Sequence, residues 1–453
     1  MITIRLKLRF KNGRKEEKSQ KEIPVLSEAE DKKHKIRTMA LSIREGYFGG
    51  LSQTLTDQFM TPYAINLNVS PTQMGILRSF LGFLSPLGQI LGSNRMKHKS
   101  RRSLVLKGVF FQLLMWPFII LLGFFAFNNW FLSFIPLLLM TFYILYSFFG
   151  STTGPSWFSL MGDIVPEDYR GRYFSKRSFL ITILAISISL IASILLEQFK
   201  NFESVFLGFF IIFSVAFLSR GISWFYLARH YYPPFKIEKH SYLSFKKFVK
   251  KIPKSNFGIF TLYMTLITFS VNIGVPYMAY YMLIELNFNY IEYVAVNLST
   301  PLISLAFFPL LGHISDKYGN TLVLRICGFL LPTLPILWIF CNTPLQLIFI
   351  PQLISAFAWT GVNLAASNFI YDNIPKQQRG FYVAYYNFFL GMGVLCGGLL
   401  GSVLLQIVPI IFVSVYETLF LISGSCRLLF DFVFLFRIKE VRVKKQNTKK
   451  KEF

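Results

Sequence analysis

The residues best suited to chemistry in this chain lie in an apolar stretch near its start, at positions 41–65. Gln53 and Asp57 are four residues apart, and so are Thr54 and Gln58. On a helix, residues at this spacing share a face, so the four side chains predict a polar stripe that lines a cavity. Such a stripe could bind a polar solute or exchange a proton. An ionised Asp at the centre of a membrane span costs about 2.5–3.5 kcal/mol, so we expect Asp57 to be paired or functional.

A partner for Asp57 can be predicted from the hairpin that follows. Arg78 lies about as far after the turn near 67–68 as Asp57 lies before it. Because a helix rises about 1.5 Å per residue, the two side chains should lie at similar depth. We predict an Asp57–Arg78 pair, which either fixes the hairpin or serves as a site where Asp57 titrates or Arg78 binds an anionic substrate. Glu45, beside Arg44, is expected to be an interfacial carboxylate, with ion coupling as the alternative.

The composition is that of a polytopic membrane protein. Hydrophobic residues make up 53% of the 453 positions and charged residues 15%, with long uncharged runs. The net charge of +25 lies in short segments between these runs, which argues against nucleic-acid binding. The four cysteines show no CxxC spacing, and no metal-ligand spacing, carboxylate pair with His or Walker motif is present. We therefore expect neither an enzyme nor a cofactor.

A membrane helix needs about 20 mostly apolar residues. This rule predicts twelve spans: 41–65, 71–93, 104–126, 130–153, 175–198, 203–228, 257–284, 290–312, 321–341, 344–370, 380–405 and 411–436. The fold class is therefore an all-α integral membrane protein.

Basic residues set the predicted orientation in the cell membrane. The turns on one side of the predicted spans contain a single basic residue, Lys200, whereas the turns on the other side are rich in Lys and Arg. The positive-inside rule then makes both termini cytoplasmic. Residues 1–40 are expected to be a basic tail, 229–256 a basic linker with a surface-lying amphipathic piece, and 438–453 a basic tail that contacts anionic lipids.

Two loop motifs occur twice. GHISDKYGN, from Gly312, has a counterpart 220 positions earlier in GSNRMKHKSRR, and DIVPEDYRGRYF from Asp163 aligns with DNIPKQQRGFYV from Asp372. The residues that carry the two motifs are Gly92, Lys97, Arg101, Arg102, Gly312, Asp316, Lys317 and Gly319 for the first, and Arg170 and Arg379 for the second. The repeats predict a duplicated chain.

The spacing GxxxDKxG between membrane-length helices resembles the loop signature of the major facilitator superfamily of transporters. The second copy has Asn320 and Thr321 where basic residues are usual, and the first has Met96 and Lys99 in place of the acid and the second glycine. The resemblance implies two pseudo-symmetric six-helix halves, 41–228 and 257–437, with a substrate site near the midplane between them.

The resemblance also implies that the first, fourth, seventh and tenth helices line a cavity. These spans, with the residues just after the fourth, hold Trp157, Asn272, Tyr280, Trp359, Asn363 and Ser367. The last three fall at four-residue steps on one face, and Pro276 should interrupt the seventh helix. Aromatic faces with amides and hydroxyls would suit a sugar or nucleoside, and ordinary packing is the alternative for each residue.

Further contacts follow from spacing and from the resemblance. Gly393, Gly397 and Gly401 allow close helix approach, which the resemblance places between the halves. Asp316 is expected to form a gate with the start of the fifth helix near Arg172 or Arg177.

Two arginines occupy similar places in the last span of each half. Arg427 and Asp431 are four apart and can pair along one helix. Arg220 needs a partner from elsewhere, for which Glu45 or helix-end carbonyls are candidates.

These observations predict a monomeric secondary transporter of a small organic solute that works by alternating access, with protons as the coupling ion. Efflux or flipping of amphipathic or lipid-like compounds is the alternative within transport, supported by 51 phenylalanines. A transporter-like receptor is the alternative of another class.

Overall fold

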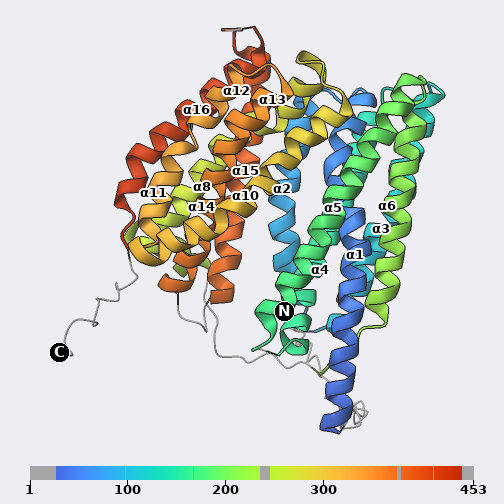
Figure 1. The fold of residues 1–453 in the computed structure, drawn as a ribbon, viewed down its shortest axis with the longest axis vertical. Helices are drawn as coiled ribbons and strands as arrows, with labels where there is room; N and C mark the ends of the chain where they lie inside the picture. Colours follow the sequence, from blue (N-terminus) through green and yellow to red (C-terminus); the bar gives the residue numbers. More distant parts are fainter. Residues whose placement is uncertain are drawn as a thin grey trace, which may run out of the picture.

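The computed structural model describes residues 27–96, 98–166, 168–234, 245–374, 379–411 and 413–440. In these ranges the chain is helical and contains no β-strand. The helices form two bundles that lie side by side (Figure 1). The predicted all-α membrane fold in two halves is confirmed.

The first half contains six long helices: α1 (Glu28–Asn66), α2 (Pro71–Arg95), α3 (Arg101–Phe127), α4 (Ile135–Ile164), α5 (Arg170–Asn201) and α6 (Val205–Ala228). After α6 come two short segments, α7 (Phe245–Lys251) and η1 (Ile252–Lys254).

The second half also contains six spans, several of them interrupted. They are α8–η3 (Asn256–Gly274, Val275–Tyr277, Met278–Tyr280, Tyr281–Glu285), α10 (Tyr290–Tyr318), α11–α12 (Asn320–Leu330, Thr333–Ile339), α13–α14 (Pro344–Leu347, Ile348–Gln352, Leu353–Asn373), α15 (Arg379–Ile407) and α16–η5 (Val415–Phe434, Leu435–Arg437). As predicted, the α-helix of the seventh span ends just before Pro276 and gives way to 3-10 and π-helical turns.

Within the described ranges, eleven of these spans are long and apolar enough to cross a membrane. The remaining span, α1, is the most polar of the twelve. It runs alongside the others in Figure 1. It begins at Glu28, where Ser27 and Glu30 form a capping box. Part of the predicted tail 1–40 is therefore helical, whereas residues 1–26 and 441–453 lie outside the described residues.

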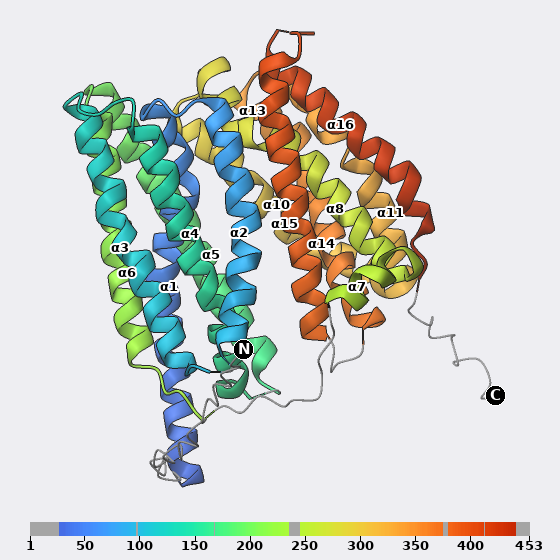
Figure 2. The same ribbon diagram turned by 180° about the vertical axis from the view of Figure 1, so that it is seen from behind.

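Helix α1 begins, α6 ends and α7 lies at one end of the bundle, which we call the terminal end, and we call the other the far end (Figures 1 and 2). Four of the far-end turns contain a residue with a left-handed backbone conformation. These residues are Asn68, Asn129, Glu203 and Asn287, with φ of 58°, 57°, 54° and 52°. Asn adopts this conformation more readily than most residues. These turns fall at or beside the turns predicted from sequence.

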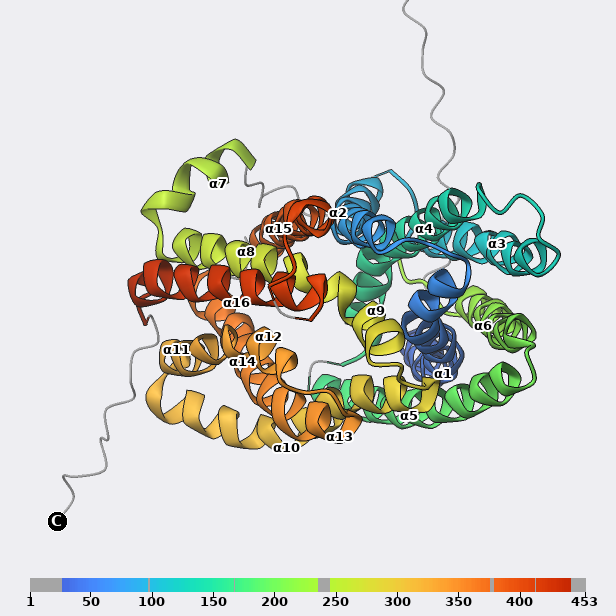
Figure 3. The same cartoon turned by 90° about the horizontal axis from the view of Figure 1, so that it is seen from above.

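The two halves touch along two helix pairs. α2 packs along α15, and α5 packs along α10. Seen from above, the other helices of the first half lie on one side of these pairs, and those of the second half lie on the opposite side (Figure 3). Toward the terminal end the two bundles spread apart (Figure 2).

The predicted place of the glycine stripe on α15 is wrong. A Cβ on Gly393, Gly397 or Gly401 would meet backbone oxygens of α8, the first segment of the same half. The face of α15 turned toward the other half instead carries Gly391 and Gly398, whose added Cβ atoms would meet α2. The four-residue stripe therefore joins helices inside one half rather than forming a sliding surface between the halves.

Candidate functional site

The four residues of the stripe predicted on α1 are all at least partly accessible. Gln53 and Asp57 are exposed, and Thr54 and Gln58 are half-buried. The Gln53 amide nitrogen donates to both carboxylate oxygens of Asp57, at 2.8 and 2.9 Å. A neutral donor therefore orients this carboxylate, and no cation of the described residues forms a direct ion pair with it.

Asp57 and Arg78 line one cavity of about 100 Å³, between α1, α2 and α4, with Thr61 and Tyr143. The predicted common depth is therefore right, but the predicted direct pair is not formed between these two described residues. Arg78 instead donates to the Thr61 hydroxyl at 3.1 Å. Because a guanidinium has five N–H donors, Arg78 keeps capacity for a further acceptor. The cavity thus presents a carboxylate and a guanidinium that remain separate.

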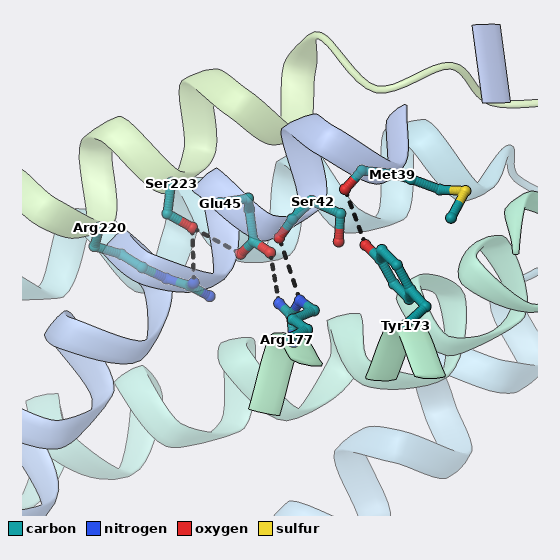
Figure 4. Close-up of polar contacts among 7 residues, drawn as sticks. All are labelled: Met39, Ser42, Glu45, Tyr173, Arg177, Arg220 and Ser223. Atoms are coloured by element: carbon teal, nitrogen blue, oxygen red, sulfur yellow. Dashed lines mark hydrogen bonds and ion pairs between the residues drawn. The ribbon is translucent and has the colours of Figure 1, made fainter. Parts of the chain in front are cut away.

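Glu45 lies in a buried ionic cluster that joins α1 to α5 and α6 (Figure 4). Its side chain contacts Arg177 of α5 at 3.0 Å and accepts from the Ser223 hydroxyl of α6 at 3.0 Å. Arg177 also donates to the Ser42 carbonyl at 3.2 Å. Glu45 is only 6% exposed, so the carboxylate expected near the membrane interface is buried between helices.

Arg220 closes the cluster from α6. Its guanidinium donates to Ser223 at 3.3 Å and to the side-chain oxygen of Gln112 on α3 at 2.6 and 2.9 Å. Its predicted partner Glu45 is therefore reached through Ser223 rather than directly. The first half thus holds a buried network that links α1, α3, α5 and α6.

The other predicted cavity residues fall in three places. Trp157 lies beside the Glu45 cluster, where the Arg177 guanidinium is 4.8 Å from its ring centre. Asn272 donates to the Thr268 carbonyl of its own helix at 2.8 Å. On α14, Asn363 and Ser367 are exposed and Trp359 is half-buried, so this face remains a candidate lining.

Tyr280 belongs to a closure at the far end. Its hydroxyl donates to the Val69 carbonyl of the first half. Nearby, the Asn66 amide donates to the Tyr290 hydroxyl at 2.8 Å, and the Tyr290 backbone N–H donates to Glu197 at 2.9 Å. These bonds cross between the halves, so the far end is closed while the terminal end is spread apart.

The repeated loop motifs meet each other. At the terminal end of the first half, Arg101 at the start of α3 contacts Asp163 at the end of α4, at 2.6 Å. In the second half, Asn320 at the start of α11 donates to Asp372 at the end of α14, at 2.9 Å. Each half thus has a brace between its two motifs, charged in one half and amide-based in the other.

The family follows from these features and from comparison with known proteins. The model of the Major Facilitator Superfamily matches residues 47–342 and 299–453. The chain belongs to the major facilitator superfamily. It is therefore a multi-pass membrane transporter rather than an enzyme. A sequence search of curated proteins gave no match.

Solved structures of other transporters resemble about nine-tenths of the chain. A mutant of the nucleoside transporter NupG is 14% identical, with a TM-score of 0.67 over 90% of this chain and 100% of that one. A bacterial homologue of the iron transporter ferroportin, in an inward-facing state, is 14% identical, with a TM-score of 0.64 over 89% of this chain and 99% of that one. A POT family transporter in complex with 5-aminolevulinic acid is 14% identical, with a TM-score of 0.63 over 90% of this chain and 96% of that one. At this identity the likeness shows the fold.

In this superfamily member the remaining motif residues pack locally. Arg102 donates to the Ala228 carbonyl at 3.3 Å, and Arg170 donates to the Gly162 carbonyl at 2.9 Å. A Cβ on Gly92 would meet the Thr152 carbonyl of α4. Lys97 and the side chain of Arg379 lie outside the described residues.

In the second half, Asp316 is exposed, the Gly312 position borders open space, and the Lys317 ammonium lies 5.0 Å from the Tyr318 ring centre. Gly319 has φ of 99° and separates α10 from α11. Arg177, a predicted gate partner of Asp316, pairs with Glu45 instead.

The predicted Arg427–Asp431 pair is also not formed between these described residues. Arg427 donates to the Leu331 carbonyl at 3.0 Å, whereas Asp431 accepts from the Tyr263 hydroxyl at 2.8 Å. Both side chains are buried and bind different helices. Their bonds tie α16 to its neighbours, which agrees with a structural role.

Several residues that matter here escaped sequence reasoning. Gln112 and Tyr143 are polar groups within apolar spans, and that contrast could have marked them. The far-end bonds of Asn66 and Glu197 carry no such signal, because both residues look like ordinary helix ends.

Proposed function

We propose that the protein is a secondary active transporter of a small polar organic solute, coupled to protons and working by alternating access. The observation that carries the proposal is the separation of Asp57 and Arg78 on one cavity. A carboxylate without a direct ion-pair partner within a membrane span is costly, which supports a functional role for Asp57. Asp57 would take up the proton, and Arg78 would bind an anionic or acceptor group of the solute.

The separate charges favour a solute that carries both a donor and an acceptor. A zwitterion can place an ammonium near Asp57 and a carboxylate near Arg78, because a carboxylate fits the fork of a guanidinium. Thr61, which accepts from Arg78, would be exchanged for the solute. Asn363 and Ser367 of α14 are proposed as contacts from the second half.

The arrangement of the halves supports alternating access. If the basic loops face the cytoplasm, as the positive-inside rule indicates, the terminal end is cytoplasmic and the conformation is open inward. Transport then requires the far-end closure to break while the terminal ends come together. Asp316 is proposed to form the gate in that second conformation, when Arg172 of α5 approaches it.

The test uses purified protein and then proteoliposomes. Thermal stabilisation at pH 5.5 and 7.5 by amino acids, sugars, nucleosides, organic acids and lipids identifies the ligand class, because a ligand bound to the folded state raises apparent stability. Uptake driven by an imposed proton gradient is then compared for wild type, Asp57→Asn and the control Asp168→Asn, which changes an exposed loop carboxylate. Unchanged proton-driven accumulation by Asp57→Asn would remove the coupling role. Binding without flux would favour a receptor.

An apolar cleft supports the alternative of transporting amphipathic compounds. It has a volume of about 360 Å³, lies between α3 and α6, and is lined by Phe124, Phe127, Phe206 and Phe210 among others. Stabilisation by lipids or amphiphiles alone in the same screen would favour this alternative.

A further inference from the structure

A second cavity lies on the outside of the first half, separate from the site around Asp57. It has a volume of about 650 Å³ and lies between α2, α3, α4 and α6. Two glycines let α2 and α3 approach α4 at its floor, since a Cβ on Gly92 would meet the Thr152 carbonyl and one on Gly108 would meet Thr153. We call this feature the lateral groove.

Three cations border the lateral groove at its terminal end. Arg95 lies in the last turn of α2, Lys99 in the following turn and Lys107 in the second turn of α3. All three side chains are exposed, and the groove lining contains no carboxylate. Within the described ranges none of the three forms an ion pair. The groove therefore has a positive rim that nothing in the described chain neutralises.

Aromatic side chains continue the groove beyond this rim. Phe110 and Phe111 follow Lys107 by three and four residues, which places them one turn deeper, about 5.4 Å along the helix. They are 48% and 42% exposed. Phe111 packs on Phe149 of α4 at 5.2 Å, and Phe110 lies 6.4 Å from Trp224 of α6. The Trp224 indole donates to the Leu106 carbonyl at 3.0 Å, which fixes that wall.

This order of groups matches one kind of ligand. A helix that spans a membrane has its first turns at headgroup depth and its next turns among acyl chains. A cluster of cations at the first depth attracts phosphate, and basic pockets between membrane helices bind anionic lipid headgroups. The exposed Phe pair lies where an acyl chain would pass.

From these observations we infer that the lateral groove is a binding site for an anionic phospholipid of the leaflet at the terminal end. The phosphate would contact Arg95, Lys99 and Lys107, and an acyl chain would lie along Phe110 and Phe111. A soluble anion could use the three cations but not the exposed rings, so the lipid fits more of the groove. The inference does not depend on the transported solute.

Trp224 supplies a local probe of this site. The full-length protein is reconstituted in phosphatidylcholine vesicles that contain 10 mol% of either brominated phosphatidylglycerol or brominated phosphatidylcholine. The fluorescence of the wild type minus that of the Trp224→Phe variant gives the Trp224 component. Quenching of this component reports brominated lipid at the groove. We expect the brominated phosphatidylglycerol to quench this component at least twofold more than brominated phosphatidylcholine. Equal quenching by the two lipids would overturn the inference, and this comparison needs no change in the rim.

Charge variants then test the rim. Arg95→Gln with Lys107→Gln should remove the preference for phosphatidylglycerol, whereas Lys176→Gln with Lys250→Gln, an equal charge change at exposed sites elsewhere, should keep it. Loss of the preference in both double variants would contradict a local site. Inorganic phosphate at 10 mM should leave quenching by brominated phosphatidylglycerol unchanged. A loss of this quenching would mean that phosphate displaces the lipid, which would instead indicate a site for soluble anions.

Discussion

Arg101 and Asp163 lie 62 positions apart in the sequence and meet at 2.6 Å at the terminal end of the first half. The contact joins two motifs that the sequence shows as separate repeats. In the second half Asn320, the first residue of α11, makes a similar contact with Asp372 of α14 through an amide donor. Each brace therefore joins the first residue of the third span of its half to the end of the fourth, with a charged pair in the first half and an amide donor in the second.

The brace gives a first prediction. Arg101→Gln should lower the stability of the folded protein by about 1.5–3 kcal/mol, the range for hydrogen bonds to charged groups, because Arg101 is 4% exposed and also donates to the Pro233 carbonyl. The unfolding midpoint in detergent measures the change. Arg102→Gln, at the adjacent exposed arginine, should shift the midpoint much less. Additive effects of Arg101→Gln and Asp163→Asn in the double variant would show that the two residues do not act as a pair.

Glu45 supports a second prediction. Glu45→Ala leaves Arg177 and Ser223 without their common acceptor, and breaking a buried ion pair costs about 3–5 kcal/mol. We therefore expect a large drop in the unfolding midpoint and in the yield of folded protein. The control Arg44→Ala removes the neighbouring exposed charge and should behave as wild type. If Glu45→Ala were equally stable but lost pH-dependent transport, Glu45 would be a coupling residue rather than a structural one.

The cases of Asp57 and Glu45 show what could be predicted from sequence and what could not. The depth of Asp57 and Arg78 follows from helix rise and the position of the turn, and both do line one cavity. They do not pair directly, because Gln53, one helical turn from Asp57, and Thr61, which faces Arg78 from α1, provide neutral partners. Spacing alone does not decide between competing partners. The partners of Glu45 lie 132 and 178 positions away, so they depend on how α1, α5 and α6 pack. The two motifs that form the brace could be found in the sequence. The contact between Arg101 and Asp163 could not, because it depends on how α3 and α4 pack.

The far-end closure gives a third prediction. Tyr290→Phe removes the acceptor of the Asn66 amide. One neutral hydrogen bond contributes about 1 kcal/mol, so the ratio of closed to open far ends should fall roughly fivefold. Spin labels at Ser133 and Asn342, exposed residues of far-end turns in the two halves, report the distance distribution. The exposed Cys396 and the half-buried Cys426 are first replaced by alanine.

The expected result of this experiment is a larger long-distance population in the Tyr290→Phe variant. Tyr318→Phe, which removes a hydroxyl at the terminal end, serves as the control and should leave the distribution unchanged. An unchanged distribution in Tyr290→Phe would mean that the Asn66–Tyr290 bond does not help to hold the far end closed.

The glycine stripe of α15 gives the last prediction. A Cβ at position 397 would lie 2.1 Å from the Phe269 carbonyl oxygen of α8, so Gly397→Ala must push two helices apart, and overpacking of this kind costs about 1–3 kcal/mol. Gly221→Ala is the matched control, because its added methyl group has no neighbour within 4 Å. Alanine is favoured over glycine by roughly 0.5–1 kcal/mol inside a helix, so the control should keep or raise the unfolding midpoint while Gly397→Ala lowers it. If both variants shifted the midpoint alike, close contact between α8 and α15 would not be what requires glycine at this position.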